Sequence, residues 1–148
     1  MADAQKIAPC GYNCSTCPAY PDGTKDEAVM ENMAKRINMS LAEFKKKGRN
    51  CPGCYASEGK PHSDNKCPTY VCCVENKNLS HCSQCDDFPC LKLAPISKQG
   101  DIRPHNSKVY NLLMLKKLGI EKYLKEGDRF WVQLARGSTP VPGDDIQV

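Results

Sequence analysis

The segment CGYNCSTCPAY, residues 10–20, places three cysteines within eight positions: Cys10, Cys14 and Cys17. Thiols at this spacing can form disulfides, bind a zinc ion or hold an iron–sulfur cluster. Pairs of cysteines separated by two residues occur at Cys14/Cys17, Cys51/Cys54 and Cys82/Cys85. Such a pair suits a metal because a tight turn directs both sulfurs at one ion, at about 2.3 Å for zinc. The three pairs therefore predict a fold organised around thiol chemistry.

The composition leaves little material for a conventional hydrophobic core. Of 148 residues, 40% are apolar, but this share includes 11 cysteines, and only 7% of the chain is aromatic. Without the cysteines the apolar share is about one third, which is low for a globular domain. We therefore expect a small, mostly α-helical and irregular domain with little or no β-sheet. Its short helices and loops would be held together by four-cysteine metal sites.

The N-terminal sequence indicates a reducing compartment. MADAQKIAPC lacks the basic and apolar regions of a signal peptide. No run of residues approaches the roughly 18 to 20 apolar residues of a membrane span. We therefore expect a cytoplasmic protein without membrane association. Cytosolic thiols stay reduced, the cysteine count is odd, and Cys72 adjoins Cys73, so a disulfide framework is disfavoured.

The net charge suggests an acidic partner, but metal binding would weaken that inference. The formal charge is +4 with neutral thiols. Zinc bound by four thiolates is a dianion, so two such sites would cancel the positive charge. The run Lys45–Lys47, with Arg49, could contact phosphate groups. Such a run is more typical of the last turn of a helix, where cations interact favourably with the helix dipole. Nucleic-acid binding is therefore a secondary hypothesis.

Two segments carry capping-box signatures: residues 24–38, with Thr24 and Glu27, and residues 40–48, with Ser40 and Glu43. The first has an apolar face at helical spacing, formed by Val29, Met30, Met33, Ala34 and Ile37. Gly48 is placed to end the second helix. The sequence therefore predicts two consecutive helices between the first two cysteine-rich segments.

A third predicted helix, residues 106–120, is rich in leucine on most of its circumference. Asn106 is its expected N-cap, and Gly119 with Ile120 its expected end. This pattern predicts a largely buried helix or a contact with a partner. We expect one domain over residues 1–135, with a cysteine-rich part (8–95), a leucine-rich helical part (104–135) and a Pro/Gly-rich tail (136–148). No internal repeat is evident beyond the cysteine pairs.

One complete ligand set is suggested by local spacing: Cys51, Cys54, Cys67 and Cys72. The intervals are those of a classical zinc finger with cysteines in both histidine positions. Cys67 precedes Pro68, so Cys67 should lie outside a helix that begins at Pro68, with Cys72 in its early turns. We therefore predict that these four thiolates hold a structural zinc ion. The insert between the pairs lacks the apolar core of a true finger.

Six further cysteines, apart from Cys73, are Cys10, Cys14, Cys17, Cys82, Cys85 and Cys90. Six thiolates are two too many for one tetrahedral site and two too few for two sites. They would form one site and a redox pair, or two sites that another group such as Cys73 or His81 completes. His81 is expected to be an exposed loop residue, and Asp86 and Asp87 to be helix caps. The fourth ligand for the first three cysteines stays open.

Iron–sulfur chemistry is the alternative to zinc, because clusters also take four thiolates. Radical enzymes that use S-adenosylmethionine have the same spacing as Cys10, Cys14 and Cys17. In these enzymes an aromatic residue comes just before the third cysteine, where this chain has Thr16, and the fold is a partial α/β barrel, which this sequence does not predict. A radical-enzyme cluster is therefore disfavoured. Cys90 opens the segment CLKLAPIS, a predicted short helix, where a thiol is favoured as ligand or nucleophile. A small iron–sulfur or thiol-redox protein, active in electron transfer or catalysis, is therefore the second hypothesis.

The order of these motifs resembles an uncharacterised cysteine-rich prokaryotic family, domain of unknown function thirty-seven ninety-five. The resemblance rests on Cys10-Gly11-x-x-Cys14-x-x-Cys17-Pro18-Ala19-Tyr20, Cys51-x-Gly53-Cys54, Cys67, Cys72 and Cys82-x-x-Cys85-x-x-Phe88-Pro89-Cys90. It implies that these ten cysteines are family positions and that Cys73 is not an essential ligand. It supports metal binding by analogy and transfers no activity. We expect two zinc ions, with structural roles, and an unknown macromolecular partner.

Overall fold

The computed structural model describes residues 3–93 and 107–126. Within these ranges the chain is mostly helical, and the β-structure is limited to an isolated bridge between Ile7 and Asn13. The expectation of short helices and loops with little or no β-sheet is confirmed for this part of the chain. The expected N-cap Asn106 and the predicted tail lie outside the described residues.

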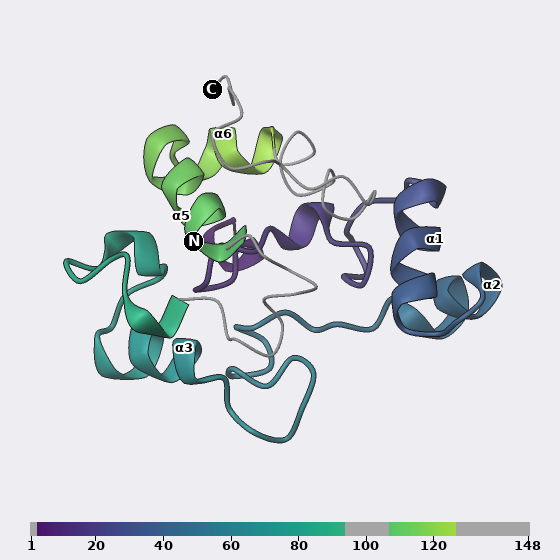
Figure 1. Ribbon diagram of the computed structural model, residues 1–148, viewed down its shortest axis with the longest axis horizontal. Helices are drawn as coiled ribbons and strands as arrows, with labels where there is room; N and C mark the ends of the chain where they lie inside the picture. The colour runs from purple at the N-terminus through teal and green to yellow at the C-terminus, as the bar shows by residue number, and fades with distance from the viewer. Residues whose placement is uncertain (1–2, 94–106, 127–148) are drawn as a thin grey trace.

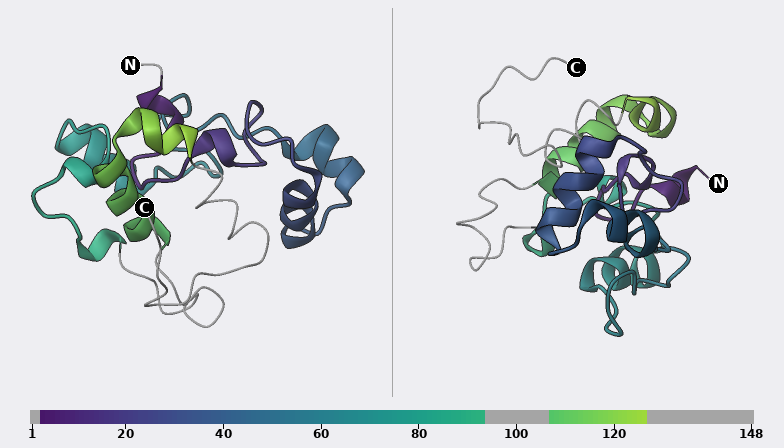
Figure 2. Two further views of the ribbon diagram at one scale, coloured as in Figure 1. Left: turned by 90° about the horizontal axis from the view of Figure 1, so that it is seen from above. Right: turned by 90° about the vertical axis from the view of Figure 1, so that its right-hand side faces the viewer.

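The helices are short and are joined by long loops. In chain order they are the 3₁₀-helices η1 (Ala4–Lys6) and η2 (Cys14–Thr16), α1 (Glu27–Arg36), α2 (Leu41–Glu43) with the π-helix η3 (Phe44–Gly48), α3 (Pro68–Tyr70) with the π-helix η4 (Val71–Asn76), the 3₁₀-helices η5 (Cys82–Gln84) and η6 (Leu91–Leu93), α5 (Ser107–Leu118) and α6 (Ile120–Lys125). Figure 1 shows α1 and α2 at one end of the molecule and α3, α5 and α6 toward the other. The view from above in Figure 2 shows the same separation, with the N-terminal segment between the two ends.

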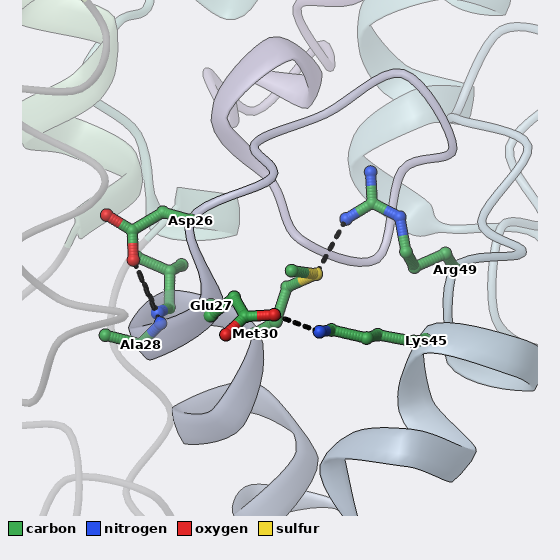
Figure 3. A network of polar contacts seen from close by, with 7 residues as sticks. Asp26, Glu27, Ala28, Met30, Lys45 and Arg49 are labelled. Atoms are coloured by element: carbon green, nitrogen blue, oxygen red, sulfur yellow. Dashed lines mark hydrogen bonds and ion pairs between the residues drawn. The ribbon is translucent and has the colours of Figure 1, made fainter.

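Helix α1 begins with a different cap from the predicted one. The Asp26 carboxylate accepts hydrogen bonds from the backbone N–H groups of Ala28 and Val29, at 3.0 and 3.2 Å (Figure 3). Thr24 instead accepts a hydrogen bond from the backbone N–H of Asp26. The predicted capping box at Thr24 is therefore wrong: an aspartate one residue before the helix reaches two free N–H groups. Ile37, which was predicted to lie on the apolar face of this helix, lies just beyond its end and is 45% exposed.

The capping box at α2 is confirmed. The Ser40 hydroxyl accepts from the Glu43 N–H, and the Glu43 carboxylate accepts from the Ser40 N–H at 3.0 Å. The chain continues as η3 to Gly48, where a Cβ would lie 2.2 Å from the Phe44 ring. Phe44 is fully buried and packs with Met30 and Ala34 of α1. This small hydrophobic cluster holds α1 against η3.

A larger hydrophobic cluster joins distant parts of the chain: Ile7, Cys73, Cys82, Leu93, Leu112, Met114, Leu115 and Tyr123. The Tyr123 hydroxyl donates a hydrogen bond to the Gly11 carbonyl at 2.8 Å, which ties α6 to the N-terminal segment. Leu113, on another face of α5, is 52% exposed. The prediction of a largely buried helix is therefore correct for one face of α5. Gly119 ends this helix with a φ of 78°, as predicted.

Arg49 connects the α1–α2 end of the molecule with the first cysteine-rich loop. Its guanidinium donates hydrogen bonds of 2.7 to 3.3 Å to four backbone carbonyls, those of Pro18, Pro21, Gly23 and Thr24. It also contacts the Met30 sulfur at 3.4 Å, and Lys45 pairs with Glu27 (Figure 3). Arg49 and Lys45, two of the basic residues considered as phosphate-binding groups, therefore interact with other groups of the protein. Arg49 lies two residues before Cys51, so its contacts also fix where the second cysteine pair begins.

Replacing Arg49 with lysine should loosen this loop, because one ammonium group cannot serve four carbonyls that a planar fork reaches together. We expect Arg49→Lys to lower the free energy of unfolding by about 1–3 kcal/mol, measured by urea denaturation. Lys46→Gln, at an exposed position of η3, is the matched control and should change it by less than about 0.5 kcal/mol. Equal stability of the two variants would contradict the role assigned to the guanidinium.

Candidate metal centres

Two of the three cysteine pairs form the same local structure. In η2 and in η5, the backbone N–H of the second cysteine donates to the carbonyl of the first at 3.1 Å, for Cys17 to Cys14 and for Cys85 to Cys82. The residue before each turn has an extended backbone. A further turn comes next in both, closed from Tyr20 to Cys17 and from Phe88 to Cys85. Each pair is therefore a knuckle, a tight turn that carries two cysteines, and such a turn is suited to holding one metal ion.

The two knuckles also share a sequence. Residues 14–21 read CSTCPAYP and residues 82–89 read CSQCDDFP, so both have the pattern Cys-Ser-x-Cys-x-x-aromatic-Pro. We call them the first and the second knuckle. The sequence alone did not reveal this repeat, because a few identical residues among eight positions are weak evidence of a repeat until the shared turns are seen. The likeness indicates that the two cysteine pairs have the same local backbone arrangement.

The first knuckle lies beside the Cys51/Cys54 pair. The backbone N–H of Cys51 donates to the Ala19 carbonyl at 3.0 Å. Gly53, with a φ of 80°, comes so close to the knuckle that a Cβ on it would lie 4.0 Å from the Cys14 sulfur. The left-handed φ explains why glycine suits this position of the CPGC turn. Two cysteine pairs are thus held next to each other by backbone contacts.

Electrostatic interactions extend this arrangement to two more thiols. Burial raises the pKa of Cys14 to about 12, and the thiols of Cys17 and Cys51 add to the rise. Burial also raises the pKa of Cys54 to about 12, with further contributions from Cys10, Cys14, Cys67 and Cys51. We call these six cysteines the first thiol group: Cys10, Cys14, Cys17, Cys51, Cys54 and Cys67. Cys10 is the member that also interacts with Cys82. A cation among these thiols would reverse the rise in pKa, because it stabilises the thiolate form.

The other five cysteines line one cavity of about 550 Å³ and form the second thiol group: Cys72, Cys73, Cys82, Cys85 and Cys90. Phe88, Pro89 and Leu93 supply apolar walls. At its rim, the Lys77 ammonium lies 3.2 Å from the Cys85 sulfur and pairs with the Asp87 carboxylate. Asp87 is therefore an ion-pair partner of Lys77, and the prediction that it caps a helix is wrong.

The structure groups the cysteines differently from their spacing in the sequence. Cys67 comes directly before α3, as predicted, but η4 carries Cys72 to the cavity of the second thiol group. The predicted set of Cys51, Cys54, Cys67 and Cys72 stays a prediction, although Cys72 lines this cavity and the other three cysteines do not. The second knuckle is also connected to the N-terminal segment, because the backbone N–H of Cys82 donates to the Pro9 carbonyl at 2.9 Å. Within residues 3–93 and 107–126, no three side chains of Cys, His, Asp or Glu converge on one ion position.

His81 is buried, contrary to the prediction of an exposed loop residue. It is 1% exposed, and its Nε2 lies 3.0 Å from the Ala4 carbonyl. Burial lowers the pKa of His81, so the ring is neutral at pH 7 and an N–H can donate to this carbonyl. The N-terminal segment, folded back onto η5, produces the burial. The Nε2 of His62 lies 3.9 Å from the Cys51 sulfur, a proximity that the sequence did not indicate.

Two buried asparagines near the thiols have polar atoms without a partner among the described residues. Asn13, just before the first knuckle, accepts a hydrogen bond from the Ser15 N–H through its Oδ1, while its Nδ2 is unpaired. Asn111 is 1% exposed, lies against Gly11, and has both amide atoms unpaired. Only burial identifies these residues, so no pattern in the sequence could have found them. Unpaired amide N–H groups are suitable donors to metal-bound sulfur, because metal ligands are commonly oriented by such hydrogen bonds.

Comparison with known families identifies the chain. Residues 6–95 match the family described as "Protein of unknown function (DUF3795)". The match covers more than half of the chain, so the protein belongs to this family, and the resemblance seen in the sequence is confirmed. No curated protein and no solved structure matches the chain. No helix in the described ranges has the length and apolarity needed to cross a membrane.

Gly23 provides a test of how tightly the first knuckle is packed. A Cβ at Gly23 would lie 1.9 Å from the Cys17 carbonyl oxygen and 3.0 Å from that of Cys14. Both contacts are with backbone, so Gly23→Ala must displace the knuckle. We expect alkylation of Cys14 and Cys17 to become about tenfold faster, which corresponds to about 1.4 kcal/mol of easier local opening. The measurement is mass spectrometry of the alkylated protein over time.

Gly119→Ala is the control for this experiment. Gly119 has a positive φ of 78°, but no atom lies within 4 Å of an added Cβ. The variant should strain the backbone between α5 and α6 while leaving the alkylation rate of Cys14 and Cys17 unchanged. Equal acceleration in both variants would indicate global destabilisation rather than displacement of the first knuckle.

Proposed function

We propose that this member of the DUF3795 family is a zinc-binding protein in which cysteine thiolates hold two ions, one in each thiol group, with a structural role for the ion of the first group. The observation that supports this proposal is the repeated knuckle, because the same backbone turn carries two cysteines at two places in the fold. The reducing cytoplasm is the compartment that we propose, because the thiol ligands must stay reduced. All eleven cysteines are free in the structure, which agrees with that requirement.

For the first ion we propose the ligands Cys14, Cys17, Cys51 and Cys54. The hydrogen bond between Cys51 and Ala19 keeps the two pairs together, and four thiolates complete a tetrahedral structural site. The thiol side chains would rotate toward the ion, since no three of the described ligand side chains converge as they stand. The unpaired Nδ2 of Asn13 would then have a thiolate to receive its hydrogen bond.

Zinc would supply stability that the apolar clusters lack. The cluster around Phe44 contains three buried residues, and the larger one includes two cysteines among its eight. Metal binding contributes directly to folding when the unfolded chain has no preformed site. The ion of the first group would therefore act as a structural link between the first knuckle and the Cys51/Cys54 pair.

A macromolecular partner is part of the proposal. Leu91 and Leu113 are 92% and 52% exposed, and we propose them as the positions to test for this contact. Nucleic acid is the less favoured partner, because Arg49 and Lys45 are engaged within the protein while Lys46 and Lys47 stay exposed. We propose no membrane association.

An iron–sulfur or thiol-redox protein is the second candidate function. The size of the first thiol group favours its thiol-redox form, because one tetrahedral zinc ion would leave two of the six cysteines unused and free to act as a redox pair. A cluster takes four thiolates as well, so the ligand set alone does not separate the two metals.

Anaerobic purification separates these two candidates. We expect a colourless protein with about two zinc ions per chain and no acid-labile sulfide, measured by elemental analysis. A brown protein with stoichiometric iron and sulfide would replace the zinc proposal with the cluster. A protein that binds neither metal would contradict both.

Variants with one cysteine changed in each of the two pairs test the ligand set proposed for the first ion. Cys17→Ser and Cys54→Ser should each lose one zinc ion, and the double variant should also lose only one, because both residues bind the same ion. Each variant should also be less stable to urea, since metal binding and folding are coupled. Cys73→Ser is the control and should keep both ions. Loss of two ions in the double variant would show that Cys17 and Cys54 belong to different sites.

A further inference from the structure

The second thiol group differs from the first in its access to a cavity. All five of its cysteines line the cavity of about 550 Å³, and none of the first thiol group does. Cys72, Cys85 and Cys90 are half-buried, whereas Cys73 and Cys82 are buried. A molecule that enters the cavity would therefore meet sulfur atoms directly. In the first thiol group the Gly23 backbone lies against the carbonyls of Cys14 and Cys17, Cys14 and Cys51 are buried, and the other four cysteines are half-buried.

The repeated knuckle indicates which thiols of this group act together. Cys82 and Cys85 correspond in sequence and in backbone hydrogen bonds to Cys14 and Cys17. Cys90 comes directly after the second knuckle and accepts a hydrogen bond from Leu93 through its carbonyl, which begins η6 beside the cavity. Cys72, in η4, supplies a fourth thiol on the cavity wall.

Cys73 has a different environment, although it also lines the cavity. It is 3% exposed, it belongs to the larger hydrophobic cluster, and its thiol donates to the Leu79 carbonyl at 3.4 Å. Its thiol also interacts with the thiol of Cys82. We assign Cys73 no ligand role because its thiol is already directed at a backbone carbonyl, so Cys73→Ser tests whether this neighbour of Cys82 belongs to the ligand set.

Lys77 provides a positive charge at the rim. Its ammonium lies 3.2 Å from the Cys85 sulfur, and it is held there by the ion pair with Asp87. A site of four thiolates and one divalent cation carries an excess of negative charge, which a neighbouring ammonium reduces. Lys77 is thus a positioning residue that would stabilise the occupied site without binding the ion.

We propose that this cavity binds one exchangeable thiophilic divalent cation, of the zinc class, through Cys72, Cys82, Cys85 and Cys90, while the first thiol group keeps its ion permanently. This inference rests on the proposed zinc-binding function and adds a division of roles between its two ions. Each thiol releases its proton to solvent as its sulfur binds the cation, so no oxidant or reductant takes part. A competing small thiol or chelator entering the cavity can replace the thiolates one after another, because ligands approach an ion best from an open side.

The test uses the wild-type, full-length protein loaded with two equivalents of zinc under reducing, anaerobic conditions. A chromophoric chelator should remove one equivalent at least about tenfold faster than the other, a ratio that corresponds to about 1.4 kcal/mol in barrier height. Alkylation after the fast phase, mapped by mass spectrometry, should label Cys72, Cys82, Cys85 and Cys90. The cysteines of the first site should stay protected. One uniform phase, or labelling of the first site instead, would overturn the inference.

Three variants sharpen the assignment without depending on the kinetics alone. Cys90→Ser should abolish the fast equivalent and keep the slow one, whereas Cys73→Ser should keep both. Lys77→Gln should weaken zinc binding in the fast phase by about tenfold, as is usual when a group beside a metal ligand is removed. Loss of the fast ion in Cys73→Ser would overturn the ligand set. A wild-type protein that binds no zinc would instead defeat the proposed function itself, so the two failures are distinguishable.

Discussion

The hydrogen bonds of one guanidinium determine how the first half of this protein is arranged. Arg49 serves the carbonyls of Pro18, Pro21, Gly23 and Thr24, which form the loop after the first knuckle. Because Arg49 precedes Cys51 by two residues, the same contacts bring the CPGC turn to that knuckle. Four carbonyls that point to one place would repel one another without a cation between them. The geometry of the first thiol group therefore depends on a residue that carries no thiol.

Among the described residues, the apolar contacts form two separate clusters. One holds α1 against η3 around Phe44, and the other joins the N-terminal segment to η4, η5, α5 and α6. Two small clusters of this kind agree with the low apolar content of the chain. The division between the clusters explains how two knuckles of the same backbone structure come to have different surroundings.

The two knuckles differ because the chain takes a different course after each of them. After Cys17 the chain turns back at Gly23 and covers the knuckle with backbone. After Cys85 the chain leads through Phe88 to Cys90 and leaves a cavity walled by apolar side chains. A closed site suits an ion with a structural role, and an open one suits an ion that exchanges. The same local turn thus lies in two different surroundings, one covered by backbone and one beside a cavity.

The sequence by itself determined features that depend on a few neighbouring residues. The Ser40–Glu43 capping box, the start of α3 at Pro68 and the end of α5 at Gly119 were predictable, because capping, proline geometry and positive φ act within one turn. Only the tertiary structure decided the burial of His81 and the division of the cysteines between two groups. Spacing along the chain limits which thiols can share an ion, but the choice among them depends on contacts between segments far apart in the sequence. Those contacts come from Arg49 and from the packing of α5 on η5, and neither leaves a periodic pattern in the sequence.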